Sequence, residues 1–379
     1  MRIRAAVLSE MGAKPPFAKS RPLQIEELEL AEPGREEVLV AIHAAGLCHS
    51  DLSVIEGNRP RQMPMVLGHE AAGVVVRTGE GVSDLRPGDH VVLVFMPSCG
   101  SCLPCAQGRP ALCEPGAAAN AKGSLLANTF KLQRPKTKTQ IYHHLGCSSF
   151  ADHAVVSRRS VIKIDKTVPL TQAALFGCAV LTGVGAVVNT AAVKPGQSVA
   201  IIGLGGVGLA AVLGAIASGA GKIVAVDIDE SKLAQAREMG ASYAINAARP
   251  EWIEQVRELT SGGVDVALEF AGVASALENA WKITRRGGLT VSAGLPPPNA
   301  ELSINIVSLV GEERTLKGSY IGTSVPMRDV PRYLELFGQG RLPVDRLLSG
   351  VLSLDEINEG FDLLQQGKVA RLLIEFKHA

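Results

Sequence analysis

Hydrophobic and polar positions follow one pattern in the first 160 residues of the 379-residue chain. Short segments in which apolar and polar residues alternate are separated by turn residues, among them Pro87-Gly88-Asp89. Alternation of this kind indicates β-strands, which we expect near residues 2–7, 38–44, 71–78 and 90–95. No helix of convincing length is predicted before about Thr171. The N-terminal part should therefore form an irregular, mainly β domain.

A second pattern begins at Ser198, where apolar runs alternate with helical patterns. The apolar runs occupy residues 199–202, 223–226, 243–246, 264–270, 289–293 and 315–320, and the helical patterns between them include 231–239, 250–260 and 274–284. Strands that alternate with helices are the signature of a doubly wound parallel sheet in an α/β fold. Beyond this region we expect helices at 327–339 and 354–366 and a returning strand at 369–376.

A glycine-rich turn joins the first strand of this second region to its first helix. It reads Gly203-Leu204-Gly205-Gly206-Val207-Gly208, a GxGxxG pattern. The first glycine permits the tight turn, the second lets backbone N–H groups approach a pyrophosphate, and the third lets helix and strand pack closely. The N-terminus of the helix then faces the phosphates with its partial positive charge. This turn predicts a dinucleotide site.

Asp227, at the end of the second apolar run, bears on which dinucleotide is bound. It follows Gly208 by 19 residues, the place where a carboxylate accepts the ribose hydroxyls. A carboxylate there would repel a 2′-phosphate, and neither Ile228 nor Asp229 offers an arginine to receive one. NAD is therefore predicted in preference to NADP.

Length and charge narrow the possible partners. The length suits two domains better than one compact core. With 38 basic and 37 acidic residues, nothing suggests a nucleic acid or an anionic membrane as partner. The opening segment has too short an apolar run for a signal peptide, so we expect a cytoplasmic protein. Two charge-free stretches, near 167–193 and 199–221, are broken by glycine, proline or polar residues and are interpreted as buried core.

Four cysteines lie within fifteen positions of the β region. Cys99, Cys102, Cys105 and Cys113 form a CxxCxxCx7C pattern, and four thiolates at this spacing can close tetrahedrally around Zn²⁺. An iron–sulfur cluster is the competing interpretation, because ferredoxin-type chains also use CxxCxxC. Those chains normally continue with CxxxCP, which the seven-residue gap to Cys113 does not match. We therefore predict a structural zinc site that stabilises a loop.

Three further metal-ligating residues are scattered along the chain. Cys48 lies in Gly46-Leu47-Cys48-His49-Ser50-Asp51, His69 in Gly68-His69-Glu70, and Cys178 in Phe176-Gly177-Cys178. A lone buried cysteine or histidine is most often core filling. Taken one at a time, none of these three residues establishes a site.

The motifs together resemble those of a known family. In order, they are the Cys48 and His69 segments, the four-cysteine run, Gly177-Cys178, Thr182-Gly183, and the glycine-rich turn with Asp227. The chain is similar to the zinc-containing alcohol dehydrogenases of the medium-chain dehydrogenase/reductase superfamily, from its first strands to Arg371. The resemblance implies a GroES-like catalytic domain over 1–179 and 323–379, with a zinc lobe near 97–115. It also implies a Rossmann NAD-binding domain over 180–322.

The resemblance also implies cofactors, partners and roles for single residues. It implies two zinc ions per chain, NAD, a small alcohol or aldehyde substrate, and a homodimer, with a tetramer as the alternative. The matching positions are Cys48, His69 and Cys178 for the catalytic zinc; the four-cysteine run for the structural zinc; Asp51 behind the zinc-binding histidine; Glu70 behind the metal; Ser50 for the substrate proton; Thr182 beside the nicotinamide; His49 and Arg371 at the pyrophosphate; and Lys232 near the adenosine ribose.

The implied reaction is reversible hydride transfer between a primary aliphatic or aromatic alcohol and NAD. Many relatives carry a histidine three residues after the proton-accepting serine, and this chain has Ser53 there, so the proton path beyond Ser50 is open. Phe95, Leu145 and Leu295 either line an apolar substrate pocket or belong to the core.

Alternative functions remain at this stage. A glutathione-dependent formaldehyde dehydrogenase would carry an arginine where Ala117 stands and an acidic residue where Arg59 stands. The basic segment 129–150 is either a solvated loop or a feature that favours an anionic substrate. A non-catalytic NAD-binding protein would lack a catalytic ligand, and a zinc-free quinone reductase would lack the four cysteines. Cys147 is expected to be a buried thiol, and His43, His90, His143, His144, His153 and His378 are expected to be structural.

Overall fold

A computed structural model describes residues 1–378, which form two compact units. The first unit contains residues 1–178, 325–334 and the chain from Leu348 onward, and the second contains residues 179–324 and 335–347. Residues 335–347 were predicted in the catalytic domain, and this part of the prediction is wrong. They pack on the second unit because Val344 and Leu347 are fully buried and Arg346 donates to the carbonyl of Glu238 at 2.7 Å.

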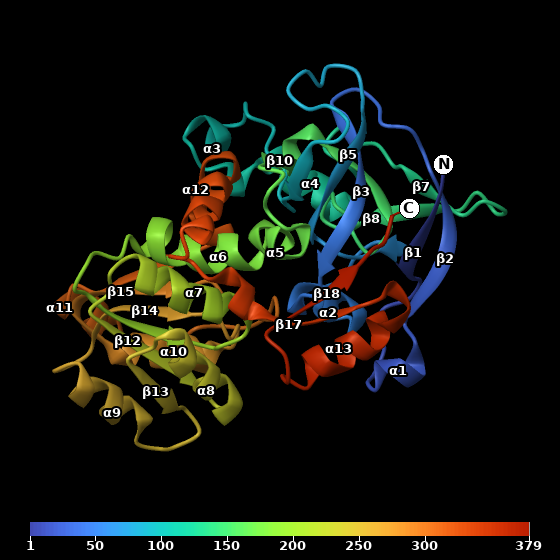
Figure 1. The fold of residues 1–379 in the computed structure, drawn as a ribbon. Coiled ribbons are helices and arrows are strands. Elements are labelled where there is room, and N and C mark those ends of the chain that lie inside the picture. Colours follow the sequence, from blue (N-terminus) through green and yellow to red (C-terminus); the bar gives the residue numbers. More distant parts are fainter. Residues whose placement is uncertain (379) are drawn as a thin grey trace. The chain divides into compact units, whose positions relative to one another are not determined.

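The first unit is built on two sets of strands (Figure 1). A closed barrel contains β1 (Arg2–Leu8), β2 (Leu23–Leu30), β7 (Leu132–Gln133), β8 (Gln140–His143) and β4 (Met65–Val66). A seven-stranded sheet runs in the order β10 (Val161–Ile164), β6 (His90–Leu93), β5 (Glu70–Thr78), β3 (Glu37–Gly46), β18 (Arg371–Glu375) and β17 (Leu348–Leu352), and β9 (His153–Ser157) also pairs with β3. Inward-facing residues of the barrel, such as Val7, Leu28 and Ile141, form a hydrophobic core.

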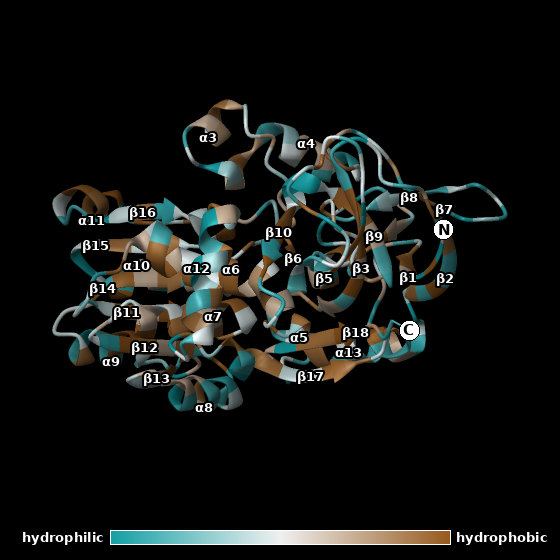
Figure 2. Ribbon diagram, turned by 45° about the horizontal axis from the view of Figure 1, so that its top comes forward, coloured by the Kyte–Doolittle hydropathy of each residue, from teal (hydrophilic) through white to brown (hydrophobic). Residues whose placement is uncertain are grey.

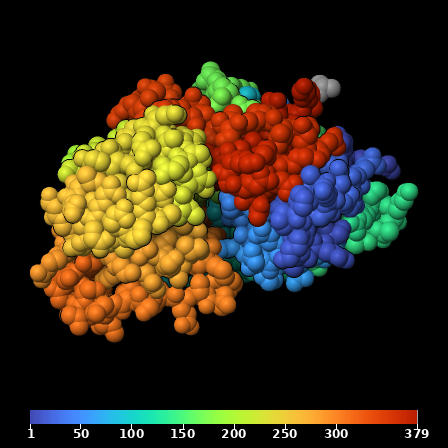
Figure 3. Space-filling model, turned by 90° about the horizontal axis from the view of Figure 1, so that it is seen from below, coloured from blue at the N-terminus to red at the C-terminus, as the bar shows by residue number. Residues whose placement is uncertain are grey.

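Short helices complete the first unit. They are α1 (Phe17–Ser20), α2 (His49–Ile55), α3 (Leu103–Ala106), α4 (Glu114–Lys122), α5 (Leu170–Ala174) and α13 (Ile357–Gln365), with 3₁₀ turns at Pro110–Leu112, Arg158–Ser160, Leu175–Gly177 and Leu354–Glu356. A blue N-terminal segment and a red C-terminal segment lie side by side in Figure 3. Asp362 of α13 accepts hydrogen bonds from the backbone N–H groups of Phe17 (2.6 Å) and Ala18 (2.8 Å).

The nine-residue helix α4 corrects the prediction that no convincing helix precedes Thr171. Few of its residues are buried, so it lacks the apolar stripe on which that prediction depended. The residues that mark this helix in the sequence are instead at its two ends. Pro115 stands in its first turn, and Gly123 ends it in the left-handed conformation with φ of 72°.

The second unit is a six-stranded parallel sheet with the order β13 (Tyr243–Asn246), β12 (Lys222–Asp227), β11 (Ser198–Ile202), β14 (Val264–Glu269), β15 (Thr284–Ser292) and β16 (Thr315–Gly318). Its helices are α6 (Ala179–Gly185), α7 (Gly206–Ala217), α8 (Glu230–Met239), α9 (Trp252–Leu259), α10 (Ala274–Ile283) and α11 (Ile306–Gly311), with a π-helix at Ala186–Ala191 and 3₁₀ turns at Ile321–Thr323 and Val344–Leu347. The helix α12 (Pro326–Gly338) has residues in both units. The sheet is largely hydrophobic and α8 mostly hydrophilic in Figure 2.

The strand order confirms the predicted doubly wound sheet. The first three strands run outward from β11 on one side, and β14, β15 and β16 continue on the other side. Such a sheet has its topological switch point between the first and fourth strands, where ligands bind outside the carboxyl ends. The glycine-rich turn leaves β11 at this place.

Residues 1–378 contain no single helix that is both long and apolar enough to cross a membrane. One bent pair, Leu170–Gly177 with Ala179–Ala191, passes that test by length and composition alone. Both of its helices bury most of their apolar residues inside the protein.

Candidate functional site

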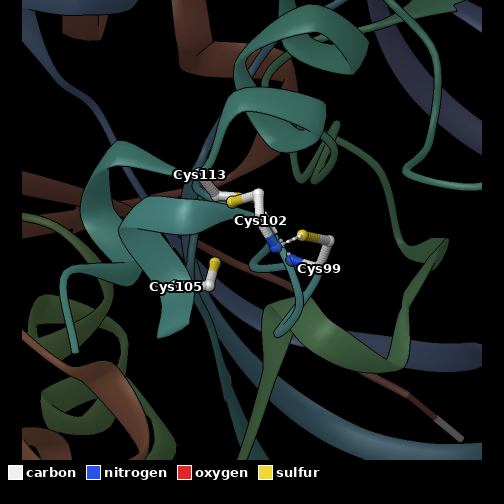
Figure 4. A group of neighbouring side chains, drawn as sticks. All are labelled: Cys99, Cys102, Cys105 and Cys113. Carbon is white, nitrogen blue, oxygen red and sulfur yellow. Dashed lines mark hydrogen bonds between the residues drawn. The ribbon is translucent and has the colours of Figure 1, made fainter. Parts of the chain in front are cut away.

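The four clustered cysteines turn their sulfur atoms toward one another (Figure 4). All four ligand atoms lie within 4.8 Å of each other, and the sulfurs of Cys102 and Cys113 are 3.9 Å apart. A disulfide would bring two sulfurs to about 2.05 Å, so these cysteines are free thiols. A tetrahedral ion with Zn–S bonds of about 2.3 Å requires sulfurs about 3.8 Å apart. The spacing of the lobe therefore fits a structural zinc site.

Backbone N–H groups around this lobe favour thiolates. Cys113 Sγ accepts from the N–H groups of Cys99 (3.1 Å) and Gly116 (3.4 Å), and Cys99 Sγ accepts from those of Ser101 (3.5 Å) and Cys102 (3.3 Å). The N–H groups of Ser101 and Cys102 lower the pKa of Cys99 to about 6, whereas burial raises the pKa of Cys105 to about 12 and also raises that of Cys113. Because a metal binds the deprotonated sulfur, these donors prepare the site for a cation.

The first unit also brings together three ligands that are far apart in sequence. Cys48 precedes the first turn of α2, His69 lies just before β5, and Cys178 follows the 3₁₀ turn Leu175–Gly177. All three residues are at most 5% exposed, and their ligand atoms lie within 4.8 Å of one another. His69 Nε2 is 3.4 Å from Cys178 Sγ, and a tetrahedral zinc site requires about 3.6 Å between sulfur and nitrogen.

This three-ligand cluster has the donor set of a catalytic zinc site, in which three protein ligands leave one coordination position open. Asp51 lies behind it in α2 and is fully buried. One Asp51 oxygen is 3.1 Å and the other 3.2 Å from His69 Nδ1, and Gly68 N–H donates to the carboxylate at 3.0 Å. Burial would raise the pKa of Asp51, but the adjacent His69 and His144 hold it at about 2. The ionised carboxylate fixes the proton of His69 on Nδ1, so Nε2 faces the thiols.

A buried ion pair lies next to the same cluster. The guanidinium of Arg371 in β18 is 3.7 Å from the Glu70 carboxylate and donates to the carbonyl of Leu47 at 3.0 Å. Burial alone would lower the pKa of Arg371, but the negative charge of Glu70 and of the thiolates raises it. Hydrogen bonding from Cys178 and the charge of Arg371 lower the pKa of Cys48 despite its burial. The surroundings therefore favour a thiolate at Cys48.

In the second unit, the three glycines of the GxGxxG pattern are needed for different reasons. Gly203 has φ of +88°, and a Cβ there would lie 2.6 Å from the backbone nitrogen of Ala271. A Cβ on Gly208 would overlap the carbonyl oxygen of Gly203. Gly205 has an ordinary φ of −69°, and a Cβ there would meet nothing within 4 Å. The protein's own packing therefore explains the first and third glycines but leaves space above the second, where a phosphate would approach.

Asp227 lies at the end of β12 beside this turn. Its two carboxylate oxygens accept from the N–H groups of Leu204 (2.7 Å) and Asp229 (3.0 Å), and the side chain is 9% exposed. These bonds fix the carboxylate at the carboxyl edge of the sheet. Gly206 and Val207 begin α7, and Lys232 lies half-buried in the first turns of α8.

The remaining predicted residues divide between the units. In the first unit, Ser50 is half-buried in the first turn of α2 and His49 is exposed at its start. The rings of Phe95 and His69 pack edge to face with their centroids 5.2 Å apart, and Leu145 follows His144 directly in the sequence. In the second unit, Thr182 lies in α6 and Leu295 is 52% exposed. Phe95 and Leu145 therefore belong to the surroundings of the metal cluster within one unit.

The neighbouring Gly183 positions α6. A Cβ on Gly183 would lie 2.9 Å from the side chain of Ala210 in α7, so α6 and α7 pack closely at this point. This contact brings Thr182 near the start of α7, the helix that the glycine-rich turn opens.

Sequence reasoning missed His144, which was expected to be structural. Asp51, His69 and His144 form a third group of potential ligand atoms within 4.8 Å, and His144 Nε2 is 3.3 Å from Asp51 Oδ1. His144 is 93 positions from Asp51 in sequence, and no local motif signals their contact.

The basic segment 129–150 is occupied by ion pairs within the first unit. Lys131 pairs with Glu37 at 2.6 Å, Arg134 with Glu26 at 2.7 Å, and Lys138 with Glu29 at 2.6 Å. These cations are compensated by neighbouring strands, which removes the support that they lent to an anionic substrate. Cys147 is fully buried, and burial raises the pKa of its thiol.

Comparisons with known proteins agree with this geometry. The family described as "Alcohol dehydrogenase GroES-like domain" matches residues 34–166, and "Zinc-binding dehydrogenase" matches residues 206–339. The chain is similar to an alcohol dehydrogenase zinc-binding domain protein from Burkholderia ambifaria, with 36% identity, full coverage of both chains and a TM-score of 0.94. It is similar to benzyl alcohol dehydrogenase from Acinetobacter calcoaceticus, with 32% identity, full coverage of both chains and a TM-score of 0.92.

A third solved structure is more distant. It is a protein from Sinorhizobium meliloti 1021 assigned as a zinc-binding dehydrogenase and bound to NADP, with 26% identity and a TM-score of 0.79. The match covers 99% of this chain and 100% of that one.

Two units, one GroES-like and one with a dinucleotide-binding sheet, define an oxidoreductase of the alcohol dehydrogenase type. The chain belongs to the zinc-type medium-chain dehydrogenases, the family of the zinc-binding alcohol dehydrogenases. The resemblance and the fold class predicted from the motifs are confirmed.

Proposed function

We propose that this protein is a zinc-dependent dehydrogenase that interconverts a primary alcohol and its aldehyde with NAD as hydride acceptor. The observation that carries the proposal is the buried group of Cys48, His69 and Cys178, two thiols and one imidazole within 4.8 Å. A zinc ion bound there supplies a Lewis acid that lowers the pKa of a hydroxyl group next to it. We further propose that the lobe holds a second zinc with a structural role.

The chain's own residues orient the reaction. Asp51 keeps the proton of His69 on Nδ1, and Arg371 compensates the negative charge of Glu70 and the thiolates. Ser50 lies two residues after Cys48 in the same helical turn, so its Oγ is the nearest hydroxyl in sequence to a metal ligand and is proposed to accept the substrate proton. Ser53 Oγ donates to the carbonyl of His49 at 2.8 Å, which commits its hydrogen to the helix. We therefore propose that the proton leaves Ser50 without passing through Ser53.

An aromatic or medium-sized apolar alcohol is the proposed substrate class. Phe95 packs its ring against His69, the buried Leu145 follows His144 in the chain, and glutamates neutralise Lys131 and Arg134 of the basic segment. A solved relative at 32% identity is a benzyl alcohol dehydrogenase, which supports the same class.

NAD is the proposed cofactor because Asp227 presents a fixed carboxylate at the edge of the dinucleotide turn. The 2′-phosphate of NADP would lie against this negative charge without an arginine at 228 or 229. Asparagine at position 227 has no negative charge to oppose the 2′-phosphate. Replacement of Asp227 by asparagine is therefore expected to narrow the preference for NAD over NADP by about tenfold or more, which corresponds to about 1.4 kcal/mol. An unchanged ratio of kcat/KM for the two cofactors would refute this role.

The test of the proposed function is NADH formation from benzyl alcohol, cinnamyl alcohol, ethanol and hydroxymethylglutathione, with NADP as a control. We expect activity on the aromatic alcohols and two zinc ions per chain by metal analysis. Ser50→Ala should lower kcat by about 10²-fold or more, whereas the matched control Ser53→Ala should leave it nearly unchanged. Zinc in the lobe alone, or activity only on hydroxymethylglutathione, would overturn the proposal.

We also propose that two copies of the chain pair through the edge of the parallel sheet. Within the described residues 1–378, the edge strand β16 pairs only with β15 and is exposed along its length. In the adjacent helix α11, Ile306, Val307 and Val310 are 72%, 77% and 71% exposed. A second β16 can continue the sheet and cover these apolar side chains. Sedimentation should give a dimer, or a tetramer built from such dimers, that Val310→Asp weakens; a monomeric wild type would contradict this.

A further inference from the structure

The imidazole of His144 is held in a fixed position. His144 follows β8, and its carbonyl accepts from the N–H groups of Cys147 at 3.0 Å and Ser148 at 3.2 Å. Its own N–H donates to Ser148 Oγ at 3.0 Å. The residue is 1% exposed. The backbone of His144 is therefore anchored, and its burial leaves the ring little room to turn away.

The ring of His144 lies against the Asp51 carboxylate. Its Nε2 is 3.3 Å from Asp51 Oδ1, an ion-pair distance, although neither ring nitrogen meets the geometry of a hydrogen bond to any of residues 1–378. A buried imidazole costs free energy unless a partner compensates for the lost water. An apolar residue of similar size would fill the same space at less cost. The contact with Asp51 therefore explains why a histidine is tolerated there.

The protonation pattern follows from the carboxylate. An ionised aspartate only accepts, so each nitrogen that faces it must carry a hydrogen. His144 then carries a hydrogen on Nε2, 3.3 Å from Asp51, and His69 points Nδ1–H at the same carboxylate, 3.1 Å away. With the N–H of Gly68 at 3.0 Å, two hydrogen-bond donors and the His144 imidazole converge on one buried carboxylate. His69 and His144 also meet edge to face, with ring centroids 5.7 Å apart.

We propose that His144 is a positioning residue that acts through Asp51 to orient the metal ligand His69. The hydrogen bonds from Gly68 and His69 and the contact with His144 restrict the orientation of the carboxylate, which keeps Nε2 of His69 directed at Cys178 Sγ, 3.4 Å away. The inference rests on the proposed function, because it needs zinc at Cys48, His69 and Cys178. It adds to that site a residue that acts through Asp51 and is not one of the three proposed metal ligands.

The adjacent His143 provides a matched control. It is buried to the same degree as His144, at 1% exposure, and ends β8 directly before it. Its Nε2 accepts from the N–H of Lys131 at 3.1 Å, and its Nδ1 is 3.4 Å from Ser148 Oγ, so it makes no contact with Asp51. A variant at His143 reports the cost of losing a buried imidazole from this part of the chain alone.

The experiment measures how firmly each zinc ion is held in the full-length protein. Zinc is removed by competition with a chromophoric chelator from wild type, His144→Phe, His144→Gln and His143→Phe, and the lobe zinc serves as the internal reference. Groups that contact a metal ligand change metal affinity by about 10- to 100-fold. His144 contacts Asp51 and not a metal ligand directly, so for His144→Phe we expect zinc affinity to fall by about tenfold at the three-ligand site and to stay unchanged in the lobe.

The variants separate positioning from folding. Gln keeps a donor near the place of Nε2 and should restore retention to within about twofold of wild type, and His143→Phe should leave the ratio of the two sites unchanged. The visible spectrum of the cobalt-substituted protein should shift in His144→Phe and not in His143→Phe. Should His144→Phe fail to fold, His144→Asn, whose amide is too short to reach Asp51, takes its place.

Each other outcome has a definite meaning. A wild type with zinc in the lobe only refutes the proposed function itself. Two zinc ions in wild type with unchanged retention in His144→Phe refute the role of His144 and leave the proposed function intact. Equal losses in His143→Phe would make the effect one of packing and overturn the proposal. A third metal ion that disappears with His144 would assign Asp51, His69 and His144 as a metal site and also overturn it.

Discussion

Alanine at Gly205 should weaken cofactor binding strongly and leave the fold intact. Gly205 has φ of −69° and ψ of −176°, values that alanine adopts without strain. Its added Cβ would meet no atom within 4 Å. The change in the free energy of unfolding should therefore stay within about 1 kcal/mol, since alanine restricts the unfolded chain slightly but is a poorer residue before a helix. The methyl group would, however, occupy the space into which a pyrophosphate must come.

Gly208→Ala is the matched comparison within the same turn. Its Cβ would overlap the carbonyl oxygen of Gly203, which is backbone and cannot swing aside. Overpacking of this kind costs about 1–3 kcal/mol, and a backbone clash belongs at the upper end. Gly208→Ala should thus lower stability, whereas Gly205→Ala should weaken NADH binding by about 100-fold, or about 2.7 kcal/mol, at nearly unchanged stability.

Two measurements separate these effects. The fluorescence of bound NADH gives the dissociation constant, and calorimetric unfolding without cofactor gives the stability of each variant. Wild-type affinity in Gly205→Ala would show that the pyrophosphate does not approach this glycine, and the argument from the empty space would be refuted. A Gly205→Ala protein that unfolds as readily as Gly208→Ala would contradict the packing analysis instead.

Three further predictions concern the first unit. Burial and the charge of Lys131 lower the pKa of His143 to about 3. The folded state then binds fewer protons than the unfolded state between this pH and about 6.5, so the free energy of unfolding should rise with pH across that window. The stability advantage of wild type over His143→Gln should be full above about pH 6.5 and should shrink in acid. A difference in stability that does not depend on pH would contradict this. Asp362→Ala removes both acceptors from the start of α1 and should lower the free energy of unfolding by about 1–3 kcal/mol. Thermal unfolding measures this change, with Asp362→Asn as control. An unchanged midpoint would argue against a stabilising contact between α13 and α1. Cys105→Ser should reduce the zinc content by one ion per chain and lower the unfolding temperature, and undiminished zinc would remove Cys105 from the lobe.

Local motifs in the sequence predicted much of the fold and part of the site. The regular alternation of apolar runs and helical patterns after Ser198 predicted the parallel sheet, because each element carries its own periodicity. The four lobe cysteines lie within fifteen positions, so a short loop suffices to gather them. The helix α4 escaped prediction because it buries few residues and carries no periodic stripe. Residues 335–347 were assigned to the wrong unit because nothing in their sequence says which core Val344 and Leu347 enter.

The catalytic cluster marks the limit of such local reasoning. Cys48 and Cys178 are 130 positions apart, and the roles of Cys48, His69 and Cys178 were inferred from family resemblance alone. Only the packing of α2, the start of β5 and the turn before α6 brings their donor atoms within 4.8 Å. The contact of His144 with Asp51 arises in the same way and had no sequence signal. Periodicity records which face of one element is buried, whereas the meeting of side chains from distant elements depends on how all the elements pack, which only the tertiary structure decides.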